Sequence, residues 1–229
     1  MNISELIHEI LLEDKTMIKL PFGDGMFDIK ASVVHTWIIM AVVFVLILIL
    51  TSNMKVHNIS RRQAAVESFV LFVRGVVKGI LGEKADRYTD YICTVLIFLG
   101  IANLSGLFGI EPPTMDLNVT VALSLMSIIL VEAAGIVEKG VGGWLKSFAA
   151  PIAVVLPMNI LELFIRPLSL CMRLFGNVLG ATVIMELIKG IFAPVLPVPF
   201  SLYFDIFDGM IQAYVFVFLT SLYIGEAVE

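Results

Sequence analysis

Arg173 stands inside an apolar stretch that runs from about residue 148 to residue 188. Its guanidinium cannot shed its charge, because the pKa of an arginine stays above ~12 in proteins. Placing such a charge at the depth of a membrane costs at least ~2.5 kcal/mol. Arg173 therefore indicates a functional site, with an ion pathway or the carboxylate of a partner close to it.

Polar residues in the same stretch are spaced so that they would share one face of a helix. Counting back from Arg173 by four, seven and eleven positions gives Ser169, Arg166 and Glu162, and counting forward by four gives Asn177. Residues at these spacings lie on one side of an α-helix. One long helix would present them as a ladder over a rise of ~22 Å. An aqueous route past a fixed cation requires such an arrangement.

Some of these positions also have a purely structural interpretation. Glu162 and Arg166 form an i, i+4 pair in the favourable orientation and could neutralise each other. Asn177 could serve only to form a hydrogen bond with a neighbouring helix. Pro167 removes a backbone hydrogen bond and would kink the helix beside the pair. Arg173 has no opposite charge within four residues, so a local ion pair does not explain it.

The last apolar stretch carries a second polar set. Asp205, Asp208 and Gln212 are spaced i, i+3 and i+7, which predicts one shared helix face. The two carboxylates could feed protons or other cations inward, or they could cap a helix end in water. Further polar positions within apolar runs are Thr182, Glu186, Glu132 and Asn103. Glu186 could also pair with Lys189.

The composition is that of a membrane protein. Hydrophobic residues make up 59% of the 229 residues and charged residues only 15%, whereas soluble domains carry roughly 25% charge. A membrane-spanning helix needs about 20 apolar residues, and such stretches occur at 33–51, 91–110, 119–136, 148–188 and 200–224. We predict an all-α polytopic fold with about five transmembrane helices, of which the last two are long and tilted.

Two stretches need separate interpretation. The stretch at 148–188 is twice the length of a simple span, so it is either a helical hairpin or one long tilted helix. Proline near its start and Gly190 near its end favour one long crossing. Residues 60–81 alternate basic and apolar side chains, which is typical of an amphipathic helix lying in the membrane interface.

Basic residues predict the orientation, because they concentrate in cytoplasmic loops. They cluster after the first and third stretches, which predicts an N-terminus outside and a C-terminus in the cytoplasm. We expect residues 1–32 to be an extracytoplasmic segment and 33–110 to hold the first spans with the cytoplasmic amphipathic helix at 60–81. Residues 111–229 would form an ion-translocating core with a long helix at 148–189 and a final helix at 200–226.

The chain resembles a known family at these residues. Pro167 to Asn177, with the sequence Pro-Leu-Ser-Leu-Cys-Met-Arg-Leu-Phe-Gly-Asn, is similar to the signature helix of subunit a of the membrane sector of bacterial F-type ATP synthase. Further similar blocks are Asp116–Thr120, Gly140–Trp144, Pro157–Glu162 and Gln212–Phe216. Together the matches cover most of residues 85–226, and the earlier part resembles the family only in general layout.

The resemblance implies the stator of a rotary motor. Subunit a lies against a ring of c subunits, and each c subunit carries a carboxylate at mid-membrane. Ions enter by one half-channel, neutralise that carboxylate, ride the ring round and leave by a second half-channel. Arg173 matches the essential arginine that separates the half-channels. A passing carboxylate is stabilised in its ionised form by this cation, and lysine would be a poorer barrier because it could deprotonate.

The resemblance also assigns roles to the other polar residues. Asn177 and Gln212 match positions that line the outer half-channel. Asp205 stands where some relatives carry a histidine, and Thr182 where they carry a glutamate, so an exchanged pair with Asp205 as the relay is expected. The predicted ion pathway comprises Asn177, Gln212, Asp205, Asp208, Glu162, Ser169, Thr182 and Glu186, with Glu162 and Ser169 on the inner side.

The expected partners are the c-ring, b-type peripheral stalk subunits, the rest of the ATP synthase complex and the lipid of a bacterial plasma membrane. No cofactor, metal or nucleic acid is expected, and ATP chemistry would belong to the soluble head. One rival is an independent secondary transporter that holds an anionic substrate on Arg173, and another is a membrane scaffold. The absence of two related halves counts against the transporter. The sequence leaves the choice between proton and sodium open.

Overall fold

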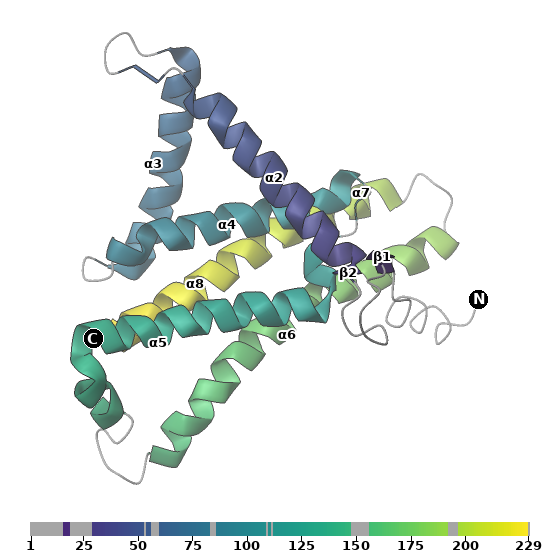
Figure 1. The fold of residues 1–229 in the computed structure, drawn as a ribbon. Helices are drawn as coiled ribbons and strands as arrows, with labels where there is room; N and C mark the ends of the chain where they lie inside the picture. The colour runs from purple at the N-terminus through teal and green to yellow at the C-terminus, as the bar shows by residue number, and fades with distance from the viewer. Residues whose placement is uncertain are drawn as a thin grey trace.

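The computed structural model describes residues 16–18, 29–52, 54–55, 60–82, 86–108, 110, 112–147, 156–191 and 197–228. Within these residues, five helical segments are long and apolar enough to cross a membrane. They are Ala31–Thr51, Asp86–Phe108, Leu117–Ser147, Leu156–Ile188 and Pro199–Val228. The predicted all-α polytopic fold with five spans is therefore confirmed (Figure 1).

The long apolar stretch is one helix in its described part. Helix α6 (Leu156–Ile191) has 36 residues and continues through Pro167. This excludes the helical hairpin and confirms a single long crossing, although residues 148–155 lie outside the described part of the chain. In Figure 1, α8 (Gly209–Val228) lies between α4 (Thr89–Leu104) and α5 (Leu117–Ser147), and α6 runs obliquely past α5 and α8.

The core lies between α4, α5 and α8, and the middle of α6 packs against it. Each of these helices turns a row of aliphatic or aromatic side chains towards the other helices. These rows pack against one another and form the core. Side chains with at most 1% exposure include Ile92 and Leu99 of α4, Val131 and Ala134 of α5, Leu170 and Leu174 of α6, and Phe216 and Val217 of α8.

The amphipathic stretch forms α3 (Arg61–Leu81). Ser60 caps its start by accepting a hydrogen bond from the backbone N–H of Gln63, and Gly82 ends it with a φ of 73°. Only Gln63, Val73, Val77 and Leu81 are buried, and the helix lies across the end of α4 in Figure 1. Its position in the membrane interface remains a prediction that follows from this one-sided burial.

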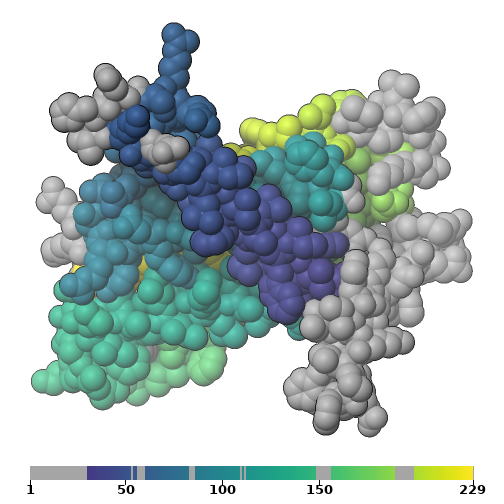
Figure 2. Space-filling view, turned by 45° about the horizontal axis from the view of Figure 1, so that its top comes forward, coloured from purple at the N-terminus to yellow at the C-terminus, as the bar shows by residue number. Residues whose placement is uncertain are grey.

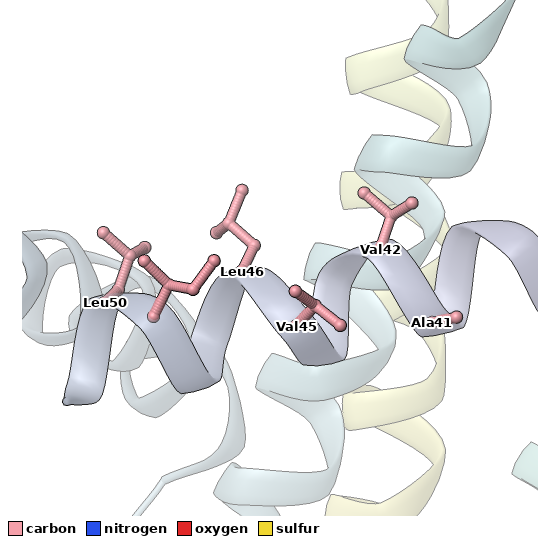
Figure 3. Close-up of a pocket in the computed structure, with 6 residues that line it drawn as sticks. Ala41, Val42, Val45, Leu46 and Leu50 are labelled. Carbon is pink, nitrogen blue, oxygen red and sulfur yellow. The ribbon is translucent and has the colours of Figure 1, made fainter.

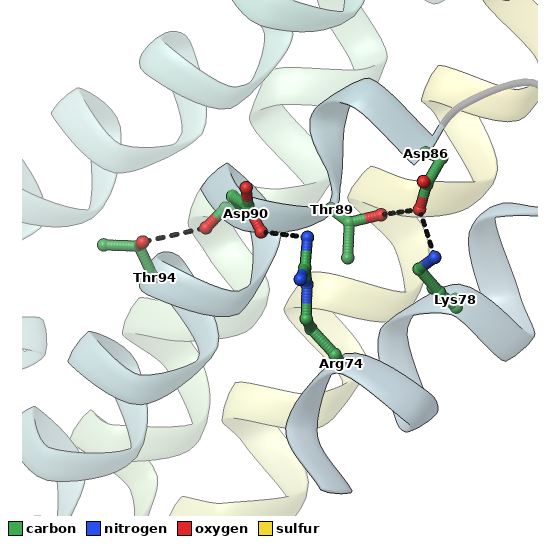
Figure 4. Close-up of polar contacts among 6 residues, drawn as sticks. All are labelled: Arg74, Lys78, Asp86, Thr89, Asp90 and Thr94. Atoms are coloured by element: carbon green, nitrogen blue, oxygen red, sulfur yellow. Dashed lines mark hydrogen bonds and ion pairs between the residues drawn. The ribbon is translucent and has the colours of Figure 1, made fainter. Parts of the chain in front are cut away.

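Two ion pairs fasten α3 to the beginning of α4 (Figure 4). Arg74 Nη2 lies 2.9 Å from Asp90 Oδ1, and Lys78 Nζ lies 2.9 Å from Asp86 Oδ1 in the short helix η1 (Asp86–Tyr88). Asp86 also accepts a hydrogen bond from Thr89 at 3.3 Å. The basic face of α3 is thus matched to acidic residues at the entry to the second span.

Helix α2 (Ala31–Thr51) is the most exposed of the spans. Only Ala31 and Ile39 are buried in it, and Figure 2 shows it lying on the surface of the molecule. Six apolar side chains line a shallow, open hollow on α2, and Figure 3 shows such side chains projecting from this helix: Ala41, Val42, Val45, Leu46, Ile49 and Leu50. An apolar surface of this extent is unsuited to water, so α2 faces lipid or another apolar chain.

Helix α5 extends further than the predicted span at 119–136. The chain bends at Gly140, whose φ of 71° and ψ of 160° are not helical, and a further helical segment continues to Ser147. The segment from Gly140 to Trp144, one of the blocks similar to the family, is therefore a bend followed by helix. A residue with a side chain is strained at this backbone geometry, which explains why glycine stands there.

The remaining elements are short. Strands β1 (Thr16–Ile18) and β2 (Ile29–Lys30) pair antiparallel before the first span. The 3-10 helices η2 (Ser105–Phe108) and η3 (Pro113–Met115) lie between α4 and α5. Helix α7 (Pro197–Ser201) leads through the π-helix η5 (Leu202–Asp208) into α8. Most of the predicted N-terminal segment at 1–32 lies outside the described residues.

Candidate functional site

Arg173 lies almost at the midpoint of α6 and is half-buried. On one side of it, Leu170, Cys171 and Leu174 are buried in the core. None of the residues that the structure describes forms a hydrogen bond or an ion pair with its guanidinium. A permanent cation at this depth thus has no counter-charge from the described part of the chain, as its sequence neighbourhood predicted.

On the other side of Arg173, α6 presents an exposed apolar face. Its members recur at i, i+4, i+7 and i+11, so they form one stripe along the helix. The stripe consists of Leu161, Ile165, Leu168 and Met172, each between 48% and 60% exposed. Arg173 lies at the boundary between this stripe and the buried face, where it can meet a group carried by an apolar neighbour.

One turn after Arg173, α6 is joined to α8 by two amide side chains. Asn177 Nδ2 donates a hydrogen bond to Gln212 Oε1 at 2.6 Å. Gln212 is only 2% exposed, and its Nε2 has no hydrogen-bond partner among the described residues. The structure therefore brings together two of the predicted pathway residues and leaves one buried donor free to bond to water or to a passing group.

Two turns before Arg173, the predicted pair of Glu162 and Arg166 forms and extends to a second helix. Arg166 Nη2 lies 3.1 Å from Glu162 Oε2 and 3.0 Å from Glu226 Oε2 of α8. The guanidinium carbon of Arg166 also lies 4.8 Å from the centroid of the Tyr223 ring. The structural interpretation of the i, i+4 pair therefore holds, and the contact with α8 was not predicted.

Asp205 lies in the π-helix η5 and turns towards a different neighbour from Gln212. Its Oδ2 accepts a hydrogen bond from Ser201 at 2.8 Å, and its Oδ1 would lie 2.8 Å from a Cβ placed on Gly106 of η2. Gln212 meets α6 instead. The expectation that Asp205, Asp208 and Gln212 share one face does not hold, because the wider turns of a π-helix shift the residues before Gly209 relative to those after it.

A buried polar node that the sequence did not predict holds the junction of η5 and α8. Asn103 Nδ2 donates to the carbonyl of Gly209 at 2.9 Å, and Thr114 Oγ1 donates to Asn103 Oδ1 at 3.0 Å. Asn103 is 4% exposed and Thr114 is fully buried. Gly209 allows the approach, since a Cβ there would lie 3.0 Å from that of Asn103. The one signal in the sequence was an asparagine inside an apolar run.

The other predicted pathway residues lie along α6 and at the end of η5. Thr182 bonds to the carbonyl of Val178 at 2.9 Å and contacts Met115 Sδ at 4.0 Å, so it faces η3. Ser169, Glu186 and Asp208 are half-buried. The side chain of Lys189 lies outside the described residues. No group of three metal-ligating side chains comes together within the described ranges.

Glu132 is engaged by an aromatic residue from the same helix. Trp144 Nε1 donates to Glu132 Oε2 at 2.8 Å, which the bend at Gly140 makes possible by folding the end of α5 back. Trp144 also lies against Gly135, where an added Cβ would come within 3.4 Å of its ring and of the Ala227 carbonyl. This contact gives Glu132 a structural partner near the end of α8.

A family model matches most of the chain. Residues 33–225 match the model described as ATP synthase A chain. The match includes every residue of the predicted ion pathway, the whole of α6, and all of α8 except its last three residues. It covers far more than the region from residue 85 onward in which the sequence motifs were recognised.

Individual relatives agree with this match. "ATP synthase subunit a" of Moorella thermoacetica is 36% identical over 210 residues, which cover 91% of this chain and 95% of the relative. "ATP synthase subunit a 2" of a Bradyrhizobium species is 35% identical over 91% of this chain and 93% of the relative. "ATP synthase subunit a, sodium ion specific" of Propionigenium modestum is 32% identical over 88% of this chain and 75% of the relative.

Proposed function

The chain belongs to the ATP synthase A chain family, and from this premise we propose that Arg173 separates two half-channels through which ions reach and leave a rotating ring. The chain is a multi-pass membrane subunit that translocates ions as part of the stator of ATP synthase. The observation that carries the proposal is that Arg173 has no partner within the described residues. Membership of this family does not favour an independent transporter.

The chemistry at Arg173 requires a carboxylate that comes and goes. A ring carboxylate that reaches the guanidinium is stabilised in its ionised form, so it releases its ion there. The same positive charge repels a cation that would otherwise pass directly from one half-channel to the other. A fixed carboxylate within the chain would neutralise this charge. Because neither α6 nor α8 supplies one, Arg173 can interact with a ring carboxylate and repel a passing cation.

The exposed apolar stripe of α6 supports the ring as the partner. Leu168 and Met172 flank Arg173 on the exposed side. An apolar helix of the ring could pack on this stripe and carry its carboxylate to the guanidinium without exposing either charge to lipid. Subunits of the b type would hold the chain against the torque of the ring.

The outer half-channel would run past Asn177, Gln212 and Asp205. Support comes from the unpartnered Nε2 of Gln212, which offers a donor to water, and from the half-buried Asp205 and Asp208. Asp205, which lies in η5, would pass ions along this outer half-channel towards Arg173. Thr182 and Glu186 lie further along α6, towards the same end of the helix.

The inner half-channel would end near Glu162 and Ser169. The Glu162 side chain is 48% exposed at the beginning of α6, and Ser169 lies one turn before Arg173 on the same helix. The distribution of basic residues supports a cytoplasmic position for this end, with the C-terminus beside it and the N-terminus outside. The ring, not this chain, would choose between proton and sodium.

The test is Arg173→Ala in the assembled ATP synthase, reconstituted into vesicles. ATP-driven ion pumping is expected to be lost while the ring and stalk subunits still copurify with the chain. Pumping at the wild-type rate would overturn the proposal. Arg173→Lys then tests the narrower claim, since full pumping by this variant would mean that a permanent charge is not needed.

A further inference from the structure

Arg166 bridges α6 and α8 two turns before Arg173. Its Nη2 bonds to Glu226 Oε2 at 3.0 Å, and its guanidinium carbon lies 4.8 Å from the centre of the Tyr223 ring. Tyr223 and Glu226 are three residues apart, so they are neighbours on one face of α8. One guanidinium therefore contacts α8 through a charge-assisted hydrogen bond and through an aromatic face, both of which suit the planar shape of arginine.

The position of this contact coincides with a weak point in α6. Pro167 follows Arg166 and has no N–H, so the carbonyl four residues earlier lacks its partner within the helix. A helix bends most easily at such a place. Arg166 is nonetheless only 23% exposed and contacts Tyr223 and Glu226 of α8. These contacts, the Arg166 tie, hold α6 at the place where it would otherwise bend.

A second tie lies on the other side of Arg173. Asn177 bonds to Gln212, and the segment of α8 between Gln212 and Glu226 contains no charged residue. Two contacts thus hold α6 against α8 at two levels, and α8 offers Arg173 no carboxylate between them. The arginine is held in place by its neighbours along the helix and not by a bond of its own.

We propose that Arg166 is a positioning residue, which sets the height and direction of Arg173 by tying α6 to Tyr223 and Glu226 of α8. The proposal rests on the function proposed for Arg173. If the tie is lost, α6 moves at Pro167, Arg173 no longer seals the boundary between the half-channels, and ions leak through the membrane sector without rotation.

A local role for Arg166 makes a different prediction. The bond to Glu162 Oε2 at 3.1 Å lies within α6, and it would suffice if Arg166 only neutralised a neighbouring charge. Glu226→Gln removes the charge on α8 and leaves the pair with Glu162 intact. It keeps nearly the same side-chain size, so it tests the connection between the helices.

The experiment uses assembled ATP synthase in vesicles and measures passive ion leak in the absence of ATP together with ATP-driven pumping. The matched control is Glu138→Gln, which removes another exposed carboxylate, on α5. Glu226→Gln is expected to raise the leak about two- to fivefold, the factor that corresponds to one partly exposed ion pair. Glu138→Gln is expected to leave the leak unchanged.

The same pair of variants is then placed in an Arg173→Gln background. A positioning role predicts that Glu226→Gln adds nothing there, because the residue through which it acts is gone. An equal rise in both backgrounds, a leak that matches the Glu138→Gln control, or loss of ring copurification by Glu226→Gln would each overturn the proposal. Failure of the proposed function would appear separately, as unchanged pumping by Arg173→Ala.

Discussion

Asn177 donates a hydrogen bond to Gln212 at 2.6 Å, and this bond joins two side chains of very different exposure. Gln212 is 2% exposed on α8, whereas Asn177 is exposed on α6. The buried amide thus depends on the exposed one for its single bond among the described residues, because its Nε2 is unpartnered. The two members of the pair should therefore respond differently to mutation.

We predict that Asn177→Leu destabilises the protein more than Gln212→Leu does. The first change leaves the whole buried amide of Gln212 without a partner, which costs about 1–3 kcal/mol. The second replaces the buried amide with an apolar side chain of similar size and leaves only an exposed amide, which water can satisfy. Thermal denaturation of the purified complex at one scan rate gives the apparent melting temperature of each variant. A lower melting temperature for Gln212→Leu than for Asn177→Leu would contradict the prediction.

The node at Asn103 gives a second prediction about stability. Asn103→Leu removes a side-chain donor to the Gly209 carbonyl and the acceptor of the Thr114 hydroxyl, both inside the bundle. The expected loss is about 2–4 kcal/mol, since each buried group left unpaired costs about 1–3 kcal/mol. Thr114→Val is the matched comparison and should cost less, because it leaves one acceptor unpaired. Equal apparent melting temperatures for the two variants would contradict this order.

The sequence predicted the parts of the structure that follow from helical spacing and apolar length. The five spans, the single long helix and the one-sided helix at 60–81 come from counts along the chain, and these depend little on tertiary contacts. Arg173 was identifiable for the same reason, since a charge inside an apolar run is costly wherever its helix lies. The pair formed by Glu162 and Arg166 is also local.

The contacts that the sequence did not reveal depend on departures from a regular helix or on distant residues. The π-helix before Gly209 shifts Asp205 away from the side of Gln212, and no residue type specifies such a helix by itself. Glu226 is sixty positions from Arg166, so the tie between them follows only from the packing of α6 beside α8. The same is true of Asn103 and Gly209.

Gly106 should control the position of Asp205. An alanine Cβ at Gly106 would lie 2.8 Å from Asp205 Oδ1, so the carboxylate must move or the helices must separate. We expect Gly106→Ala to slow ATP-driven ion pumping several-fold without loss of assembly. Gly79→Ala on α3 is the control, because nothing lies within 4 Å of its added Cβ. In an Asp205→Ala background the effect of Gly106→Ala should vanish, and a persistent effect would mean that the clash acts elsewhere.

The bend at Gly140 should determine whether Trp144 reaches Glu132. With a φ of 71° and a ψ of 160°, the position suits glycine, and a side chain there costs about 1–3 kcal/mol. Gly140→Ala should therefore straighten or displace the end of α5 and break the bond from Trp144 Nε1 to Glu132 Oε2. In a Trp37→Phe background Trp144 is the sole tryptophan, so its fluorescence should shift to longer wavelength as the indole becomes more exposed. Gly142→Ala, which has open space around its added Cβ and no positive φ, should leave the emission unchanged, and an equal shift in both variants would refute the role of the bend.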